Sequence, residues 1–234
     1  MRYRTKNINK WNLKYFETGE FQVIQERLHD LDREFGKGKS YNPHSDLIFE
    51  SLDRSVPEDV RCVLVGQDPY PNPNHCTGIP FSIPATEQHY PPTLTNIFKE
   101  YSDDLGYPTP SSGNLDLWVK RGVFLWNVYP TVGRQKNNPH HWDEWLYLTE
   151  EVFKTLDNDR MVFVFLGRKA QSTAKYCSKS QRIMTSHPSP LGVNSGFFGS
   201  RIFSRVNALL DEPIDWRLPD ADKITEKEST AEST

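Results

Sequence analysis

Long apolar runs and paired cysteines are both missing from this 234-residue sequence. No apolar stretch approaches the roughly 20 residues that a membrane-spanning helix needs, and the amino-terminal MRYRTKNINKW lacks the apolar core of a signal peptide. The three cysteines (Cys62, Cys76 and Cys177) are odd in number and form no CxxC pair, which argues against a disulfide framework or a cysteine-ligated zinc site. We therefore expect no membrane segment and a reducing compartment: the cytoplasm, or the nucleus if the source is eukaryotic or viral.

Motifs for nucleotide cofactors, serine hydrolases and metals are also missing. The sequence contains no GxxxxGK[ST], no GxGxxG and no GxSxG. Its one pair of adjacent histidines, His140 and His141, has no carboxylate or cysteine at metal-ligand spacing, so we interpret the pair as structural. We expect neither a metal nor a cofactor.

The charge is small overall but uneven along the chain. Lys and Arg number 28 and Asp and Glu 31, so the formal net charge is −3, which by itself disfavours a nucleic-acid partner. Residues 160–205, however, contain eight Lys and Arg and no acid, a local charge of +8 that we interpret as one phosphate-facing surface. We interpret residues 1–15 as a basic arm and residues 219–234 as a disordered acidic tail, leaving residues 16–218 as one domain.

Four short runs of β-branched and aromatic residues predict strands, and longer amphipathic patterns predict helices. Most strand runs are apolar throughout, as expected for strands buried on both faces of a parallel sheet. They span residues 61–67, 122–127, 161–167 and 182–187. The helical patterns span residues 21–35, 93–105, 142–156 and 197–210. Their alternation predicts a single α/β domain with a central four-stranded, mostly parallel sheet flanked by helices.

Residues with useful chemistry stand where the predicted strands end. Asp68 follows the first strand, Asn127 ends the second, Arg168 follows the third, and His187 ends the fourth. Because ligands of open α/β sheets bind outside the carboxyl ends of the strands, we expect these side chains in one crevice. Each alone has an ordinary explanation: Asp68 could cap a turn, His187 and Asn127 could bind backbone, and Phe81 could be core.

Taken together, the motifs resemble the family 1 uracil-DNA glycosylases over about residues 40–218. The resemblance rests on VLVGQDPYPNPNHCTGIPFS, PPTLTNIFKE, GVFLWNVYPTV and SHPSPLGVNSGFFGSRIFSRVNALL followed by PIDW, in this order. It implies a four-stranded parallel sheet flanked by helices. It also implies a monomeric, metal-independent enzyme that removes uracil from single- and double-stranded DNA and leaves an intact strand with an abasic site. A proteinaceous glycosylase inhibitor is a further partner that the family suggests.

The resemblance also implies a role for each site residue. Phe81 would stack on a flipped-out uracil, Asn127 would read its Watson–Crick edge, and the Tyr70 ring would exclude the methyl group of thymine. His187, as a neutral imidazole, would donate to uracil O2, helped by the main chain at Gln67. Asp68, the other catalytic residue, would position water and stabilise the cationic sugar.

Leu191 would enter the minor groove as a wedge beside the vacated position. The further DNA contacts that the resemblance implies are Thr93, Gly167, Arg168, Ser189 and Pro190.

The sequence departs from the family pattern at four positions. Pro71 stands where His is usual, Arg168 and Gly192 where Ser is usual, and Thr93 where Ser is usual. These changes leave two alternatives open: a DNA-binding scaffold with little catalysis, and a mismatch thymine or broad-specificity glycosylase, which Tyr70 disfavours. Turnover and base release from matched oligonucleotides discriminate among them.

Overall fold

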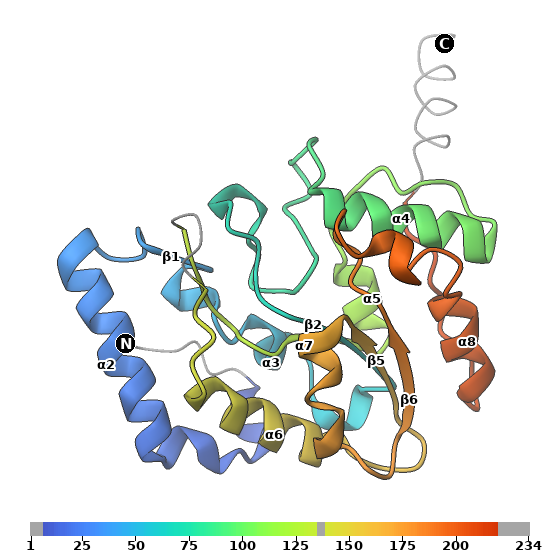
Figure 1. Ribbon diagram of the computed structural model, residues 1–234. Coiled ribbons are helices and arrows are strands. Elements are labelled where there is room, and N and C mark those ends of the chain that lie inside the picture. The colour runs from blue at the N-terminus through green and yellow to red at the C-terminus, as the bar shows by residue number, and fades with distance from the viewer. Residues whose placement is uncertain (1–6, 135–138, 220–234) are drawn as a thin grey trace, which may run out of the picture.

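Four parallel strands form the centre of the molecule, in a computed structural model that describes residues 7–134 and 139–219 (Figure 1). Their spatial order is β3-β2-β5-β6, and every neighbouring pair is parallel. The bounds are β2 Cys62–Gly66, β3 Val123–Asn127, β5 Val162–Leu166 and β6 Gln181–Thr185. The predicted fold class is confirmed, and the predicted strand ends lie within two residues of those observed.

A second, two-stranded sheet was not predicted. Strand β1 (Tyr41–Asn42) pairs antiparallel with β4 (Val132–Gly133). Two-residue strands have no periodicity that a sequence could reveal. This small sheet matters because it brings Asn42 and Arg134 next to the loop that follows β2.

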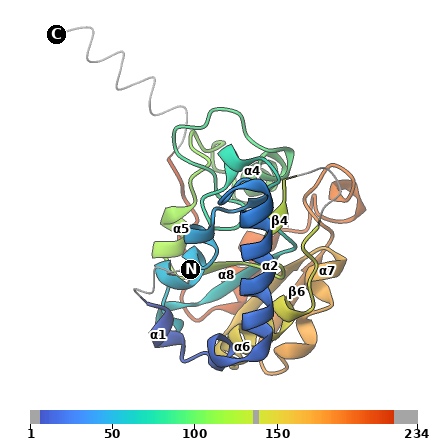
Figure 2. The same ribbon diagram turned by 90° about the vertical axis from the view of Figure 1, so that its left-hand side faces the viewer.

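Helices cover both faces of the central sheet. Figures 1 and 2 show the long helix α2 beside α6 on one side and α4 near α8 on the other. The helix bounds are α1 Ile8–Trp11, α2 Gly19–Phe35, α3 Glu50–Arg54, α4 Pro92–Leu105, α5 Asp116–Lys120, α6 Glu144–Leu156, α7 Arg168–Gln171 and α8 Ile202–Leu209.

Alternate residues of the central strands enter two separate cores. Val63 and Val65 of β2 pack with the residues of α2 and α6, whereas Cys62 and Leu64 pack with those of α4 and α8. All five residues of β2, β3 and β5 are buried. The continuous apolar character of these strands follows, because neither of their faces contacts water.

The helix predicted over residues 197–210 begins later than expected. The buried Glu100 side chain accepts hydrogen bonds from the backbone N–H of Gly199 and of Arg201, both at 2.7 Å. Gly199 and Arg201 also have positive φ angles of 75° and 54°, which a right-handed helix excludes. Residues 197–201 therefore form turns, and α8 starts at Ile202.

Part of the predicted basic arm packs against the domain. Ile8, Trp11 and Tyr15 are buried, and Trp11 Nε1 donates to the carbonyls of Leu52 and Ser55 at 3.1 Å. Residues 1–6 of the predicted arm and residues 220–234 of the predicted tail lie outside the described residues.

Candidate active site

Two hollows meet at the carboxyl ends of the central strands. The first, here the aromatic pocket, is lined by Tyr70, Phe81, Trp126 and Asn127 among others. The second, here the long groove, has the lining residues Gln67, Asp68, Gly167, Arg168, Lys169, Gln171, Ser172, Met184, Thr185, Ser186, His187, Ser189, Leu191, Gly192, Ser195 and Gly196. The loop that follows β2 supplies residues to both. Asp68, Arg168 and His187 line the long groove and Asn127 lines the aromatic pocket, so the residues expected in one crevice are divided between two hollows.

The loop Gln67–Pro71 is fixed by side chains from other segments. The buried Asn42 amide donates to the carbonyls of Tyr70 at 3.2 Å and of Pro71 at 2.7 Å. Arg134 Nε in turn donates to Asn42 Oδ1 at 2.7 Å. The Cys76 thiol donates to the Tyr70 carbonyl at 3.1 Å, and burial raises its pKa to about 12, so it remains protonated. Neither Asn42 nor Arg134 was predicted as a support of this loop, because both lie far from it in the chain.

Phe81 and Tyr70 fix each other across the aromatic pocket. The Tyr70 hydroxyl donates to the Phe81 carbonyl at 3.1 Å, and burial raises the pKa of Tyr70 far above its usual value. Phe81 has a φ angle of 65°, a strained conformation for an aromatic residue that its surroundings must impose. Gly66 is required beneath the ring, since a Cβ there would lie 2.6 Å from Phe81 Cζ and 2.5 Å from Asn127 Oδ1.

Asn127 is the last residue of β3, and its side-chain amide lines the aromatic pocket. Only 6% of Asn127 is exposed. No hydrogen bond joins its amide group to any side chain or backbone group of residues 7–134 and 139–219. A nearly buried amide normally finds partners, so its oxygen and NH₂ group are suited to a ligand that offers one donor and one acceptor.

His187 is held as a neutral ring with a defined proton. The backbone N–H of Ser189 donates to His187 Nδ1 at 3.0 Å, so Nδ1 is the acceptor and Nε2 carries the hydrogen. Burial lowers the pKa of His187 below its ordinary value, while the charge of Asp68 acts in the opposite direction. The ring is therefore a neutral Nε2–H donor at pH 7.

The loop that contains His187 depends on two close approaches by glycine. A Cβ on Gly167 would lie 2.8 Å from His187 Cβ, and a Cβ on Gly192 would lie 2.7 Å from the His187 carbonyl oxygen. Gly192 N–H donates to the Ser189 carbonyl at 2.9 Å, which closes the loop. The Asn96 side chain of α4 donates to the Pro188 carbonyl at 2.8 Å, another contact that sequence reasoning missed.

The two adjacent histidines, interpreted from the sequence as structural, have different surroundings. His140 is 1% exposed, and its Nδ1 lies 3.2 Å from Thr131 Oγ1. Burial, with a smaller effect from His141, lowers the pKa of His140 to about 4. His141 instead enters the site, where its Nε2 lies 3.1 Å from Asp68 Oδ2.

Four of the six predicted DNA contacts line the long groove. Leu191 is 98% exposed at the tip of its loop, and Gly167, Arg168 and Ser189 line the groove with it. Thr93 is half-buried and Pro190 is exposed, and both lie outside that lining. Thr93 occupies the second position of α4, one turn before Asn96, which bonds the His187 loop.

The acid-free stretch does not form one surface, contrary to the sequence-based interpretation. Arg160 lines a hollow with Glu58, Asp211 and Glu212, near the amino ends of the central strands. Arg201 forms an ion pair with the buried Asp104. The stretch crosses the sheet along β5 and β6, so its cations are distributed to both ends.

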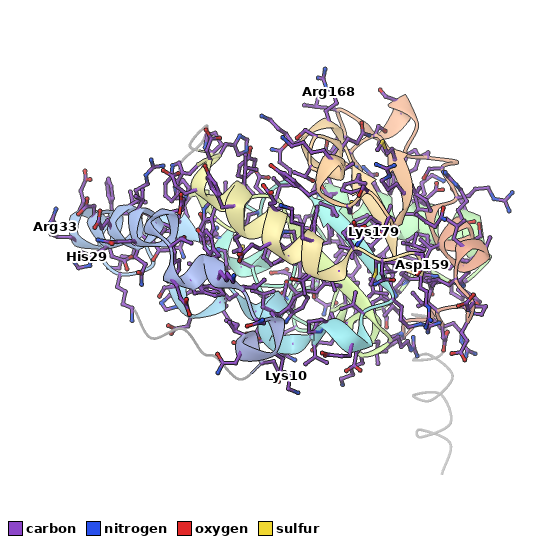
Figure 3. The ribbon with its side chains drawn as sticks, turned by 90° about the horizontal axis from the view of Figure 1, so that it is seen from below. Lys10, His29, Arg33, Asp159, Arg168 and Lys179 are labelled. Carbon is purple, nitrogen blue, oxygen red and sulfur yellow. The ribbon has the colours of Figure 1, made fainter. Side chains whose placement is uncertain are left out.

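Arg168 and Lys169 are the cations of that stretch that line the long groove. Figure 3 shows Arg168 projecting from one side of the molecule and Lys10 from the opposite side, so these two cations do not share a surface.

Neither a membrane-spanning helix nor a metal-binding cluster is found in the described part of the chain. Among residues 7–134 and 139–219, no helix has the length and apolar character to cross a bilayer. The same residues contain no group of three or more His, Cys, Asp or Glu placed to share a metal ion.

Comparison with known proteins identifies the family. Residues 54–211 match the Uracil DNA glycosylase superfamily. The chain is 40% identical over 195 residues to the uracil-DNA glycosylase of Thermobifida fusca, covering 81% of this chain and 85% of the relative. It is 41% identical over 215 residues to that of Bacillus velezensis, covering 88% and 92%.

Solved structures agree with the fold. A mimivirus uracil-DNA glycosylase superposes with a TM-score of 0.75 at 24% identity, covering 90% of this chain and 87% of that chain. A mimivirus UNG variant in complex with UGI gives a TM-score of 0.80 at 24% identity, covering 92% and 89%. The motifs, the parallel sheet and the extent of the similarity lead to one conclusion: the chain belongs to the uracil-DNA glycosylase family.

Proposed function

We propose that this protein removes uracil from DNA by hydrolysing the bond between N1 of the base and C1′ of the sugar. The observation that carries the proposal is the Asn127 amide, which is nearly buried, has no hydrogen-bond partner among the described residues, and lines the aromatic pocket with Phe81 and Tyr70. The activity of the curated relatives named uracil-DNA glycosylase supports it.

The aromatic pocket accounts for base selection. Uracil that leaves the stack can lie against Phe81, with N3–H donating to the Asn127 oxygen and O4 accepting from its NH₂ group. Cytosine presents an acceptor and a donor at the corresponding atoms, so both contacts fail and a polar pair is left unsatisfied. The Tyr70 ring, fixed through its bond to the Phe81 carbonyl, occupies the space that the thymine methyl needs.

Asp68 and His187 account for the chemistry. As the C1′–N1 bond breaks, negative charge develops on the base and positive charge on the sugar. The Nε2–H of neutral His187 donates to uracil O2 and stabilises the first charge, while the Asp68 carboxylate stabilises the second and orients the water that bonds to C1′. The uracil anion leaves with the bonding electron pair and takes up a proton from solvent, and the water gives up one proton to solvent as its oxygen bonds to C1′. No atom of a metal ion is needed at any step.

Leu191 accounts for base extrusion. An apolar side chain that is 98% exposed on a loop fixed at its base is suited to fill the gap in the stack. Ser189, Gly167, Arg168, Thr93 and Pro190 remain the proposed phosphate contacts. Because Arg168 replaces an uncharged side chain, we expect binding to duplex DNA to depend more steeply on salt.

Partners and location extend the proposal. We propose that the protein acts as a monomer in the cytoplasm, or in the nucleus of a eukaryotic or virus-infected cell. We also propose that a proteinaceous inhibitor can bind over the long groove, since a mimivirus UNG variant forms a complex with UGI.

Base release from matched oligonucleotides tests the function. Single-stranded oligonucleotides with one uracil, thymine or cytosine are incubated with the protein in EDTA, and free base and alkali-labile sites are measured. We expect many turnovers on uracil alone. Folded protein that only binds the uracil strand stoichiometrically indicates the scaffold instead, and thymine release from a thymine–guanine mismatch indicates the broader glycosylase.

Asp68→Asn is the matching variant for this test. It preserves the shape of the side chain but removes its charge, so turnover should fall by about 10²- to 10⁴-fold. Wild-type turnover in this variant would contradict the assigned chemistry.

A further inference from the structure

His141 contacts the catalytic carboxylate, although it lies 73 residues further along the chain. Its Nε2 is 3.1 Å from Asp68 Oδ2, and the Gln67 amide nitrogen is also 3.1 Å from that same oxygen. The two nitrogens are 3.4 Å apart. One carboxylate oxygen is therefore approached from two sides by nitrogen atoms of different segments.

The proton positions follow from the donor inventory. The Gln67 amide nitrogen carries only donors, so it cannot accept a hydrogen bond. Asp68 Oδ2 can only accept hydrogen bonds when the carboxyl group is ionised. Both nitrogens can donate to it if His141 carries its hydrogen on Nε2. The other carboxylate oxygen, Oδ1, accepts no hydrogen bond from the described residues. The carboxylate thus has one oxygen held by protein and one available.

The His141 ring is itself fixed in place. It stacks on Tyr129 with ring centroids 4.3 Å apart and an interplanar angle of 25°. Tyr129 is 6% exposed and its backbone N–H donates to the Gln67 carbonyl at 2.9 Å. The same tyrosine therefore supports both groups that bond Asp68, one through its ring and one through its backbone.

The loop after β2 offers no imidazole of its own at this point. The residue that follows Tyr70 is Pro71, whose ring has neither a donor nor a charge. The His141 side chain is only one-quarter exposed, as is that of Asp68, so their contact lies at the edge of the site where water still has access.

We propose that His141 is a positioning residue of the glycosylase reaction, an inference that rests on the proposed function. Its Nε2–H, together with Gln67, holds Asp68 Oδ2 and turns Oδ1 toward the attacking water and the cationic sugar. His141 touches neither substrate nor water in this role. It acts by removing the rotation of a carboxylate that must point in one direction for water to reach C1′.

Two substitutions separate the hydrogen bond from the ring contact. His141→Phe keeps an aromatic ring against Tyr129 but removes the Nε2–H. His141→Gln removes the ring but keeps an N–H donor at nearly the same distance from the backbone. His29→Phe, on the distant helix α2 (Figure 3), is the matched control for replacing a histidine by phenylalanine.

The readouts are kcat and KM on a single-stranded uracil oligonucleotide, with Tm for each variant. We expect His141→Phe to lower kcat by about 10- to 100-fold with unchanged KM and Tm, the range seen when a supporting contact of a catalytic group is lost. His141→Gln should keep kcat within a few-fold of wild type. In the Asp68→Asn background, His141→Phe should have no further effect, because the carboxylate it orients is gone.

Three results would overturn the proposal. The first is a wild-type kcat in His141→Phe. The second is a fall in kcat in His141→Gln that is as large as that in His141→Phe and is accompanied by a fall in Tm. The third is a fall in kcat caused by His141→Phe that is as large in the Asp68→Asn background as in the wild type. If the wild type releases uracil and any of these results is obtained, the role of His141 is rejected and the proposed function stands. No uracil release by folded wild type rejects the proposed function and the inference with it.

Discussion

The loop after β2 and the loop after β6 each carry a proposed catalytic side chain, yet they are held in opposite ways. The first, Gln67–Pro71, is bonded by Asn42, Cys76 and His141, which come from three other segments of the chain. Its conformation is therefore a property of the whole domain. A change far away in sequence can move Asp68.

The second loop is held mainly by its own atoms. Ser189 N–H bonds His187 Nδ1, Gly192 N–H bonds the Ser189 carbonyl, and Ser186 Oγ bonds the Gly192 carbonyl at 2.8 Å. Asn96 adds one bond from α4. The difference teaches that part of the support of Asp68, from Asn42 and His141, is found only in the folded structure, whereas most hydrogen bonds of the His187 loop join residues of its own motif.

The largest effect is expected within the second loop. His187→Ala removes the donor to uracil O2, and kcat should fall by about 10²- to 10³-fold on single- and double-stranded DNA alike. Single-turnover base release measures it. A loss confined to KM would show that the two loops do not share the chemistry between them.

Gly192→Ala tests how tightly the second loop closes on itself. The added methyl would lie 2.7 Å from the His187 carbonyl oxygen, so the backbone must shift and carry the imidazole with it. A displacement of this kind should lower kcat by up to about 10²-fold while Tm changes little. Single-turnover kinetics and thermal unfolding provide the two numbers, and unaltered kinetics would mean that the loop can relax without moving His187.

Leu191→Ala separates the DNA contact from the chemistry of the same loop. Less apolar surface enters the duplex, so base release from double-stranded DNA should slow by about tenfold. Release from single-stranded DNA should be unchanged, because no stacked gap has to be filled. Equal losses on the two substrates would contradict the wedge role.

Asn42→Ala tests the external support of the first loop. The carbonyls of Tyr70 and Pro71 and the Arg134 guanidinium each lose a buried partner. The free energy of unfolding should fall by about 1–3 kcal/mol and kcat by a few-fold. Urea unfolding and steady-state kinetics measure the two effects, and Asn42→Asp, which keeps the acceptor for Arg134 but not the donors, is the partner variant.

The smallest expected effect is a change in the pKa of His187, which reports the electrostatic interaction between the two loops. The Asp68 charge raises the pKa of His187 against the lowering by burial. Asp68→Asn should therefore lower the His187 pKa further and extend the pH range, on the acid side, in which the ring stays neutral. NMR titration of the imidazole nitrogens measures this shift. An unchanged or raised pKa would show that the loops are electrostatically independent.

The strands and long helices were predictable because their signal is local. Continuous apolar runs mark strands buried on both faces, and β2, β3 and β5 follow that pattern. The start of α8 was not predictable, because Glu100, almost a hundred residues earlier, captures the backbone N–H groups that a longer helix would have used.

The proposed catalytic residues were assigned from motifs, whereas the residues that support them were not. The positions that resemblance assigned, such as Asp68 and His187, are brought together at the strand ends. The contact of His141 with Asp68 was not predicted, because nothing in the sequence distinguishes His141 from His140. Asn42, Asn96 and Arg134 were missed because they lie far along the chain from the loops they support.

The order of the strands implies different rates of amide hydrogen exchange in the strands that precede the two loops. Strand β2 is hydrogen-bonded to β3 on one side and to β5 on the other, whereas β6 is bonded to β5 alone within the described sheet. Amide hydrogens of β2 can exchange with solvent only when the domain core opens, but those of β6 exchange through local fraying. We therefore expect Asp68, the proposed water-orienting residue, to follow a strand with slow amide exchange, and Leu191, the proposed wedge, to lie in the loop after a strand with faster exchange.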